Sequence, residues 1–415
     1  MNGVIFMSKP FGEIKFSQRI LKVEESPTFA LERKVDEIDS RLKKEGNYVV
    51  RFGIGQPDFN TPDNIKEAGK RAIDENKTKY TPSSGIKELK MAVAAKLEKE
   101  NSVRYDADNI LVGNGAKQVL DDIMRTLVDI NDMVLLPKPY WVSYSQQVIL
   151  SGGIPVGVNF NEDLKMDLEH FRQVIKNNTK NGSAGSIKLL ILNSPNNPTG
   201  AVYTKKELEA IGEICLSNNI FIVSDEVYEK FIYGRAKHYS IASFSDELKE
   251  ATITVNAVSK TYAMTGWRIG YCAARRDIIK QMAKVQDQSP SNPCTISQWA
   301  ALEALTGSQD SVGIMRNEYE KRRDYIYKRL KNIKGIECTI PEGAFYIFPD
   351  ISGLYNGSRI KGSAKFAEEL LGQAYVAVVP GFTFGDDNYI RISYAASMDK
   401  IVDGMDRFEE FCKGI

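Results

Sequence analysis

The sequence predicts an α/β fold built around a mostly parallel sheet. Short apolar runs, such as residues 187–192 and 220–223, alternate with longer helical stretches, such as residues 205–217. This alternation is typical of parallel strands joined by crossover helices. The chain has 415 residues, of which 42% are hydrophobic, so it is long enough for a large core and for two domains.

Most of the alternation lies in residues 56–310, which we expect to form the larger domain. A helix is expected over residues 116–128, and strands are expected near residues 134–136 and over residues 252–256. The polar run 177–186 contains Asn, Gly and Ser and is predicted to be a loop before a strand.

A smaller α+β domain is expected from the two ends of the chain. It combines residues 311–415 with residues 1–55, which also provide an N-terminal arm. A long polar stretch that ends near residue 331 is predicted to be a helix, and the runs 343–348 and 376–379 are predicted to be strands.

The composition gives no indication of a nucleic-acid or membrane partner. Lys and Arg balance Asp and Glu to a formal net charge of +1, and no apolar stretch approaches the roughly 20 residues that cross a bilayer. The first residues do not resemble a secretory signal, and the five cysteines are widely spaced without a C-x-x-C pair. We therefore expect a cytoplasmic protein with reduced cysteines.

The histidines do not predict a metal centre. Only two are present, His170 and His238, and neither has the spacing of a metal ligand. A zinc enzyme or a serine-histidine hydrolase is therefore not favoured, and no metal site is predicted.

Polar side chains follow three of the predicted strands. Asn197, Asp225 and Lys260 each come shortly after an apolar run, and ligands in open α/β sheets bind beyond the carboxyl ends of the strands. A lysine in such a place is unusual, because its ammonium group resists desolvation unless it is paired, deprotonated or covalently used. The sequence therefore suggests that Lys260 forms a Schiff base.

Several motifs, in order along nearly the whole chain, resemble a known family. They are Gly53-Ile-Gly-Gln-Pro-Asp-Phe59, Lys79-Tyr-Thr-Pro-Ser-Ser-Gly85, Gly113-Asn-Gly-Ala-Lys-Gln118, Pro139-Tyr-Trp-Val-Ser-Tyr144, Asn196-Asn-Pro-Thr-Gly200, Asp225-Glu-Val-Tyr228, Ser259-Lys260, Gly266-Trp-Arg268 and Tyr389-Ile-Arg-Ile-Ser393. Together they resemble the pyridoxal-phosphate-dependent class I aminotransferases, in particular the bacterial and archaeal aspartate aminotransferase branch. The resemblance implies fold type I, with a mostly parallel seven-stranded sheet in the large domain, and pyridoxal 5′-phosphate as the cofactor.

The resemblance assigns cofactor contacts to the predicted crevice. Lys260 is implied to be the catalytic residue that bonds to the cofactor. A carboxylate must stabilise the protonated pyridine nitrogen, and this role is implied for Asp225, which taken alone is as readily explained as a helix cap. Asn197 and Tyr228 resemble the family's donors to the phenolic oxygen, and Trp141 matches the aromatic residue that stacks on the cofactor ring.

The cofactor phosphate needs backbone donors and positive charge. Gly115, Ala116 and Lys117 provide a helix N-terminus with a glycine that permits close approach, and Arg268 resembles the family's phosphate-binding arginine. Tyr80 resembles the tyrosine that reaches the phosphate of the partner subunit, which implies a homodimer with active sites at the interface.

The resemblance also implies the substrate contacts. Arg391 matches the arginine that binds the α-carboxylate, a task suited to its bidentate geometry, and Gly55 matches a glycine whose backbone closes over the substrate. Lys117 and Thr28 correspond to residues that hold a second carboxylate. The implied substrate-binding residues are Gly55, Thr28, Lys117, Trp141, Asn197 and Arg391.

The expected reaction is ping-pong transamination of L-aspartate and 2-oxoglutarate to oxaloacetate and L-glutamate. A prephenate, aromatic or alanine aminotransferase stays an alternative, with Phe382 and Phe384 as a possible aromatic pocket or as simple packing residues. A carbon-sulfur lyase or a decarboxylase would use the same Lys260, Asp225 and Arg391. A cofactor-sensing regulator is disfavoured, because no basic helix-turn-helix pattern is present.

Overall fold

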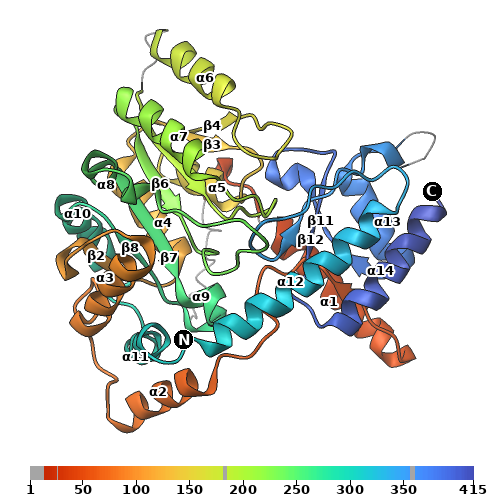
Figure 1. The fold of residues 1–415 in the computed structure, drawn as a ribbon, viewed down its shortest axis with the longest axis horizontal. Helices are drawn as coiled ribbons and strands as arrows, with labels where there is room; N and C mark the ends of the chain where they lie inside the picture. The colour runs from red at the N-terminus through yellow and green to blue at the C-terminus, as the bar shows by residue number, and fades with distance from the viewer. Residues whose placement is uncertain (1–13, 26, 181–184, 356–359) are drawn as a thin grey trace, which may run out of the picture.

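In the computed structural model, residues 14–25, 27–180, 185–355 and 360–415 are described, and a seven-stranded sheet lies at the centre of the larger part (Figure 1). Its strands are β2 (Ile110–Gly113), β3 (Met133–Pro137), β4 (Ile154–Val158), β5 (Ile187–Asn193), β6 (Phe221–Asp225), β7 (Thr252–Ala257) and β8 (Gly270–Ala273). Their order is β2-β8-β7-β6-β5-β3-β4, and β8 alone runs antiparallel to its neighbours. The predicted fold class is confirmed.

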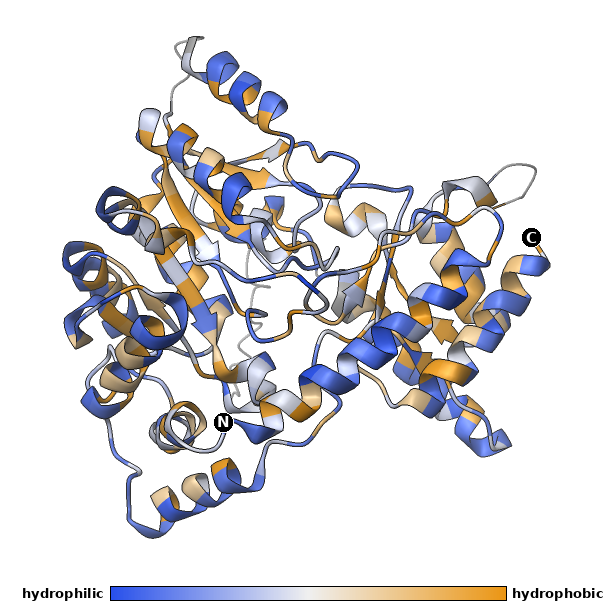
Figure 2. Ribbon diagram, in the orientation of Figure 1, coloured by the Kyte–Doolittle hydropathy of each residue, from blue (hydrophilic) through white to orange (hydrophobic). Residues whose placement is uncertain are grey.

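Helices cover both faces of this sheet, because neighbouring residues of each strand point to opposite sides. In β5, Leu189 and Ile191 pack in one buried cluster, whereas Leu190 and Leu192 pack in another. The helices of this part are α2 (Asp63–Asp74), α3 (Lys87–Asn101), α4 (Ala116–Leu127), α5 (Ser143–Leu150), α6 (Leu168–Lys180), α7 (Lys205–Ser217), α8 (Asp246–Ala251), α9 (Val258–Thr261), α10 (Arg276–Asp287) and α11 (Thr295–Thr306). Figure 2 shows the apolar strands between helices that carry both polar and apolar residues, as a three-layer arrangement requires.

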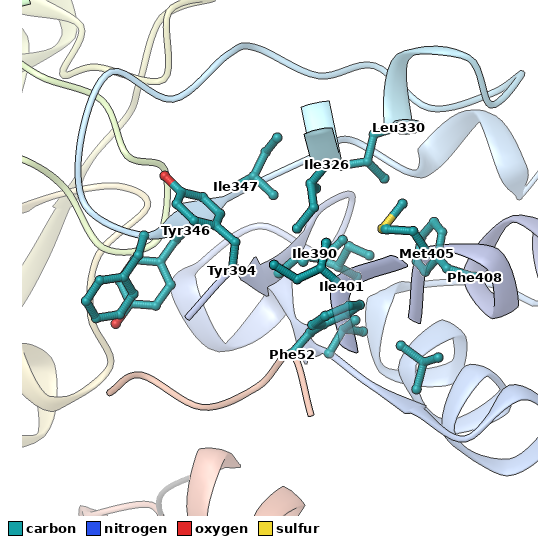
Figure 3. Packing of buried hydrophobic residues seen from close by; sticks show 14 of the residues in the cluster. Phe52, Ile326, Leu330, Tyr346, Ile347, Ile390, Tyr394, Ile401, Met405 and Phe408 are labelled. Atoms are coloured by element: carbon teal, nitrogen blue, oxygen red, sulfur yellow. The ribbon is translucent and has the colours of Figure 1, made fainter. Parts of the chain in front are cut away.

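The two ends of the chain pack together in a second, smaller part. Its elements are α1 (Pro27–Leu42), β1 (Val50–Arg51), α12 (Asp310–Lys331), β9 (Tyr346–Ile347), α13 (Ser363–Ala374), β10 (Val376–Ala377), β11 (Val379–Pro380), β12 (Ile390–Ser393) and α14 (Met398–Lys413). Strand β1 pairs in parallel with β10, and Phe52 lies among Ile401, Met405 and Phe408 (Figure 3). This packing agrees with the predicted grouping of residues 1–55 with 311–415, although the exact boundaries stay a prediction.

Helix α12 connects the two parts. Val312, near its start, packs in a buried cluster of the larger part, whereas Ile326 and Leu330 pack in the cluster of the smaller part. No helix within the described ranges combines the length and the apolar character needed to cross a membrane.

The two strands predicted in the C-terminal part are wrong in their extent. The run 376–379 is split between two sheets, since β10 pairs with β1 and β11 pairs with β12. Periodicity did not reveal the break because all four residues of the run are buried. The run 343–348 contributes only Tyr346–Ile347, because Ala344 adopts a left-handed conformation, with φ +57°, that interrupts an extended backbone.

Candidate active site

The carboxyl ends of β5, β6 and β7 bring three predicted residues to one edge of the sheet. Asn193 ends β5 and pairs in register with Asp225 at the end of β6. The amide of Asn193 donates to the Asp225 backbone oxygen over 2.9 Å, and its Oδ1 accepts from the Asn197 N–H over 2.8 Å. The turn with Asn197 is therefore tied to the strand with Asp225, as parallel strand ends predict.

Asp225 is a buried carboxylate with two hydrogen-bond donors. The Tyr144 hydroxyl donates to its Oδ2 over 2.7 Å, and the Val227 N–H donates to its Oδ1 over 3.2 Å. Burial raises the pKa of Asp225 to about 6, against the lowering effect of these two bonds. A cation at this position would favour the ionised carboxylate.

Lys260 lies in α9, just beyond β7, and its Nζ donates to the Gly55 backbone oxygen over 2.5 Å. Burial lowers the pKa of Lys260 to about 8, and the positive charges of Arg391 and Arg268 act in the same direction. A neutral amine is the reactive form of a lysine nucleophile. The site therefore makes Lys260 far more reactive at neutral pH than a solvated lysine.

An anion cradle lies at the start of α4. Gly115 has φ +83°, and a Cβ there would lie 2.4 Å from Nη2 of Arg268, so any side chain would displace the guanidinium. Arg268 donates to the backbone oxygens of Asn114 and Thr265 over 3.2 and 2.9 Å. Among the described residues, no side chain caps α4. Free helix N–H groups beside an arginine suit a phosphate.

Lys117 and Trp141 meet next to this cradle. The Nζ of Lys117 lies 4.8 Å from the centre of the Trp141 ring, and that ring packs edge-on against Tyr144 with centroids 5.4 Å apart. Partial desolvation lowers the pKa of Lys117, and the charge of Arg268 lowers it further. The site therefore has a second cation beside an aromatic platform.

Arg391 in β12 is 3% exposed and faces the same edge of the sheet. Its Nη1 donates to Oδ1 of Asn197 over 2.9 Å, and its Nη2 donates to the Gly53 backbone oxygen over 2.7 Å. Its Nε is buried without a hydrogen-bond partner among the described residues. A buried cation with an unsatisfied donor is suited to bind a carboxylate.

A comparison of the sequence with models of known protein families agrees with this geometry. Residues 47–405 match the family model described as aminotransferase class I and II. The chain is a member of this family. The fold class, the enzyme class and the dependence on pyridoxal phosphate predicted from the sequence are thereby confirmed.

Relatives match the aminotransferase over nearly its whole length. A probable aspartate/prephenate aminotransferase of Aquifex aeolicus is 47% identical over 398 residues, which cover 95% of this chain and 98% of that relative. An aspartate aminotransferase of Bacillus sp. strain YM-2 is 44% identical over 96% of this chain and 99% of its own length. The solved aspartate aminotransferase of Thermus thermophilus with maleate is 38% identical, with a TM-score of 0.88 and coverage of 96% and 100%.

The residues of the aminotransferase fit its cofactor. The buried carboxylate of Asp225 would suit a protonated pyridine nitrogen, the cradle of Gly115 and Arg268 would suit the phosphate, and Lys260 would offer the amine for the predicted covalent bond. Tyr228 lies close to Arg391 and forms a 2.8 Å hydrogen bond with the Tyr346 hydroxyl. Each assignment of a residue to a cofactor atom stays a prediction.

The structure of a single chain does not show two of the predicted residues, Tyr80 and Thr28, in the crevice. Tyr80 is 90% exposed to solvent, as expected of a residue that acts on a partner subunit. Thr28 lies in the first turn of α1, but its side chain is outside the described part of the structure, so its predicted contact is untested.

Three residues to which the sequence assigned no role, Tyr144, Asn193 and Tyr346, contact the predicted site residues. Tyr144, the donor to Asp225, comes three residues after Trp141, and this spacing could have placed both on one side of a helical turn. Asn193 directly follows the apolar run 187–192, the signal that also singled out Asp225, and could have been found in this way. Tyr346 had no such signal, because strand alternation alone does not distinguish a site-facing residue from a packed one.

Proposed function

We propose that this aminotransferase transfers the amino group of L-aspartate to 2-oxoglutarate, giving oxaloacetate and L-glutamate. The observation that carries the proposal is that two cations, Arg391 and Lys117, lie near Lys260. They come in addition to Arg268, which belongs to the proposed phosphate cradle. Both Arg391 and Lys117 lower the pKa of Lys260, so both lie within electrostatic reach of the reactive amine. Two cations suit the two carboxylates of a dicarboxylic amino acid.

The names of the relatives support a dicarboxylic substrate. The Bacillus relative is named an aspartate aminotransferase, and the Thermus structure was solved with maleate, which is a dicarboxylate. The Aquifex relative is named for both aspartate and prephenate. Prephenate is therefore the second candidate, as an amino acceptor in place of 2-oxoglutarate.

The proposed mechanism divides the work among the residues of the crevice. Pyridoxal phosphate, when bound, supplies an electron sink for the charge left on the substrate α-carbon. Asp225 holds the proton on the pyridine nitrogen, and Arg391 orients the substrate through its α-carboxylate. Lys260, as a neutral amine, moves the proton between the substrate α-carbon and the C4′ carbon of the cofactor.

We further propose a homodimer in which Tyr80 completes the phosphate site of the partner subunit. The support is that Tyr80 is 90% exposed in a single chain, although a large aromatic side chain usually buries much of its surface. A cytoplasmic location also stays our expectation.

Replacing Lys117 by Ala tests the substrate proposal. The matched control is Lys77→Ala, because Lys77 also lies over a tryptophan ring, at 3.5 Å from the centre of Trp299. A charged hydrogen bond contributes about 1.5–3 kcal/mol, so Lys117→Ala should lower kcat/KM for aspartate by roughly 10- to 100-fold. The kcat/KM for alanine as the donor should change little in Lys117→Ala. Lys77→Ala should leave kcat/KM unchanged for both donors.

Equal impairment of aspartate and alanine by Lys117→Ala would show that Lys117 does not bind the second carboxylate. Replacing 2-oxoglutarate by prephenate in the same assay measures the second candidate directly. Turnover with prephenate at a similar kcat/KM would extend the acceptor range.

A further inference from the structure

A cluster of buried polar side chains contacts the turn that carries Asp225 and Tyr228. Two carboxylates of the same turn, Glu226 and Glu229, form its centre, and the side chains of Glu226 and Glu229 are 1% and 5% exposed. We call this group the Glu229 cluster. It comprises Lys96, Asn101, Ser224, Glu226, Glu229, His238, Ser240 and Asn256.

Glu229 joins the turn to two separate elements. Its carboxylate forms an ion pair with Lys96 of α3, whose side chain is 6% exposed. It also accepts from the Asn101 amide over 2.7 Å and from the Asn256 amide of β7 over 2.9 Å. Burial would raise the pKa of Glu229, but Lys96 and His238 lower it to about 2, so the carboxylate stays charged at neutral pH.

Glu226 holds the beginning of the same turn. It accepts from the hydroxyls of Ser224 and Ser240 over 2.9 and 2.8 Å, and from the Asn101 amide over 3.1 Å. A ring nitrogen of His238 lies 3.1 Å from its Oε2. The Nδ1 of His238 is buried without a hydrogen-bond partner among the described residues. The Lys96 ammonium already provides the cation of the cluster, so we interpret these contacts as a hydrogen-bonded network rather than a metal site.

The spacing of the four turn residues connects the cluster with the predicted cofactor residues. Asp225 and Tyr228 are three residues apart and contact Tyr144 and Tyr346, whereas Glu226 and Glu229, also three apart, contact the cluster. The two pairs therefore face different surroundings. Any shift of the cluster would be transmitted to Asp225 and Tyr228 through one short turn.

We propose that Glu229, held by Lys96, Asn101 and Asn256, is a positioning residue that sets the places of Asp225 and Tyr228 around the cofactor. This inference rests on the proposed roles of Asp225 and Tyr228. Glu229 touches neither cofactor nor substrate, and it acts through the turn. Supporting partners of this kind are what hold a functional group within the narrow range of productive geometries.

The test compares Glu229→Gln with the wild-type protein and with Asp39→Asn. Asp39 is a matched control in the smaller part of the molecule, because its buried carboxylate also pairs with a cation, that of Arg51. It accepts a further hydrogen bond from the Val49 backbone N–H, whereas Glu229 accepts from side-chain amides. Three quantities are measured for each protein. They are the melting temperature of the cofactor-free chain, its Kd for pyridoxal phosphate from an absorbance titration, and the pH midpoint of the visible band of the bound cofactor.

Glu229→Gln should raise the Kd for pyridoxal phosphate by about 10-fold, the lower end of what the loss of a supporting partner causes at metal sites. It should also raise the pH midpoint of the visible band, because a displaced Tyr228 stabilises the phenolic oxygen less well. Asp39→Asn should lower only the melting temperature. If Glu229→Gln also changes only the melting temperature, the cluster is purely structural and the inference is overturned.

Glu229→Gln leaves Lys96 buried without a counter-ion, so a second variant removes both charges. Replacing a buried ion pair by apolar residues of similar volume usually preserves the fold. The Lys96→Met/Glu229→Met double variant should fold and still show the weaker cofactor binding and the shifted midpoint, and wild-type values of both would overturn the inference. If the wild-type protein itself gave no visible band with pyridoxal phosphate, the roles of Asp225 and Tyr228 would fail instead.

Discussion

Replacing Asp225 by Asn should stabilise the cofactor-free protein while it abolishes transamination. Asp225 is buried, and burial raises its pKa from 3.8 to about 6. The native state therefore resists ionisation of a carboxyl group that the unfolded chain ionises readily. In the working enzyme the positive charge of the bound cofactor would stabilise the ionised carboxylate. The free-energy cost of burying this charge is therefore present only when the cofactor is absent.

The magnitude follows from linkage. A shift of roughly two pKa units, at about 1.4 kcal/mol each, gives about 3 kcal/mol. Because the raised pKa belongs to the folded state, the unfolded state binds fewer protons between pH 3.8 and about 6, and stability falls as the pH rises through that window. Asn cannot accept from both Tyr144 and Val227, and losing one bond costs about 1 kcal/mol. The net gain for Asp225→Asn above pH 6 is therefore about 2 kcal/mol.

Urea unfolding of both cofactor-free proteins at several pH values measures this gain. The difference in the free energy of unfolding should be about 2 kcal/mol in favour of Asp225→Asn at pH 8. It should fall to zero between about pH 4 and pH 5, and should reverse to about 1 kcal/mol in favour of the wild type below about pH 3.5, where only the lost hydrogen bond counts. The comparison cancels the titration of all other groups. A variant that is no more stable than the wild type at pH 8, or a difference that does not change with pH, would refute the reasoning.

Three other substitutions test separate parts of the site. Lys260→Ala should remove both the visible band and turnover, while circular dichroism shows that the protein stays folded; retained turnover would exclude a covalent role for Lys260. Arg391→Lys should raise KM for every amino acid donor by roughly 10- to 100-fold, since lysine cannot form the bidentate contact, and an effect on only one donor would contradict this role. Tyr144→Phe should raise the Kd for pyridoxal phosphate by about 10-fold, because the Asp225 carboxylate loses a hydrogen-bond donor. An absorbance titration with pyridoxal phosphate measures this Kd, and an unchanged value would mean that the bond is not needed.

The sequence predicted the larger part of the fold because its elements have clear periodicities. Helix α7 was predicted at its exact bounds, and β5, β6 and β7 within two residues. The smaller part was less predictable, because its strands are two to four residues long and their partners are distant in sequence. No local pattern indicates that Val50 pairs with Val376.

The candidate site was predictable where a residue stands at the end of an apolar run. Lys260 and Asp225 drew attention in this way, since charged groups rarely follow buried strands without a reason. Tyr346 and Glu229 did not, because their importance comes from contacts made after folding, to Tyr228 and to Lys96. A buried glutamate in a polar stretch of sequence cannot be distinguished from a solvated one.

The central claim is that this aminotransferase carries the amino group of aspartate on its cofactor and delivers it to a 2-oxo acid. The most direct test adds L-aspartate alone to the cofactor-loaded protein and follows the visible band, then adds 2-oxoglutarate. We expect the band to be lost with one equivalent of oxaloacetate per active site and to return on addition of 2-oxoglutarate. A band unaffected by aspartate, or oxaloacetate formed continuously without an acceptor, would contradict the account.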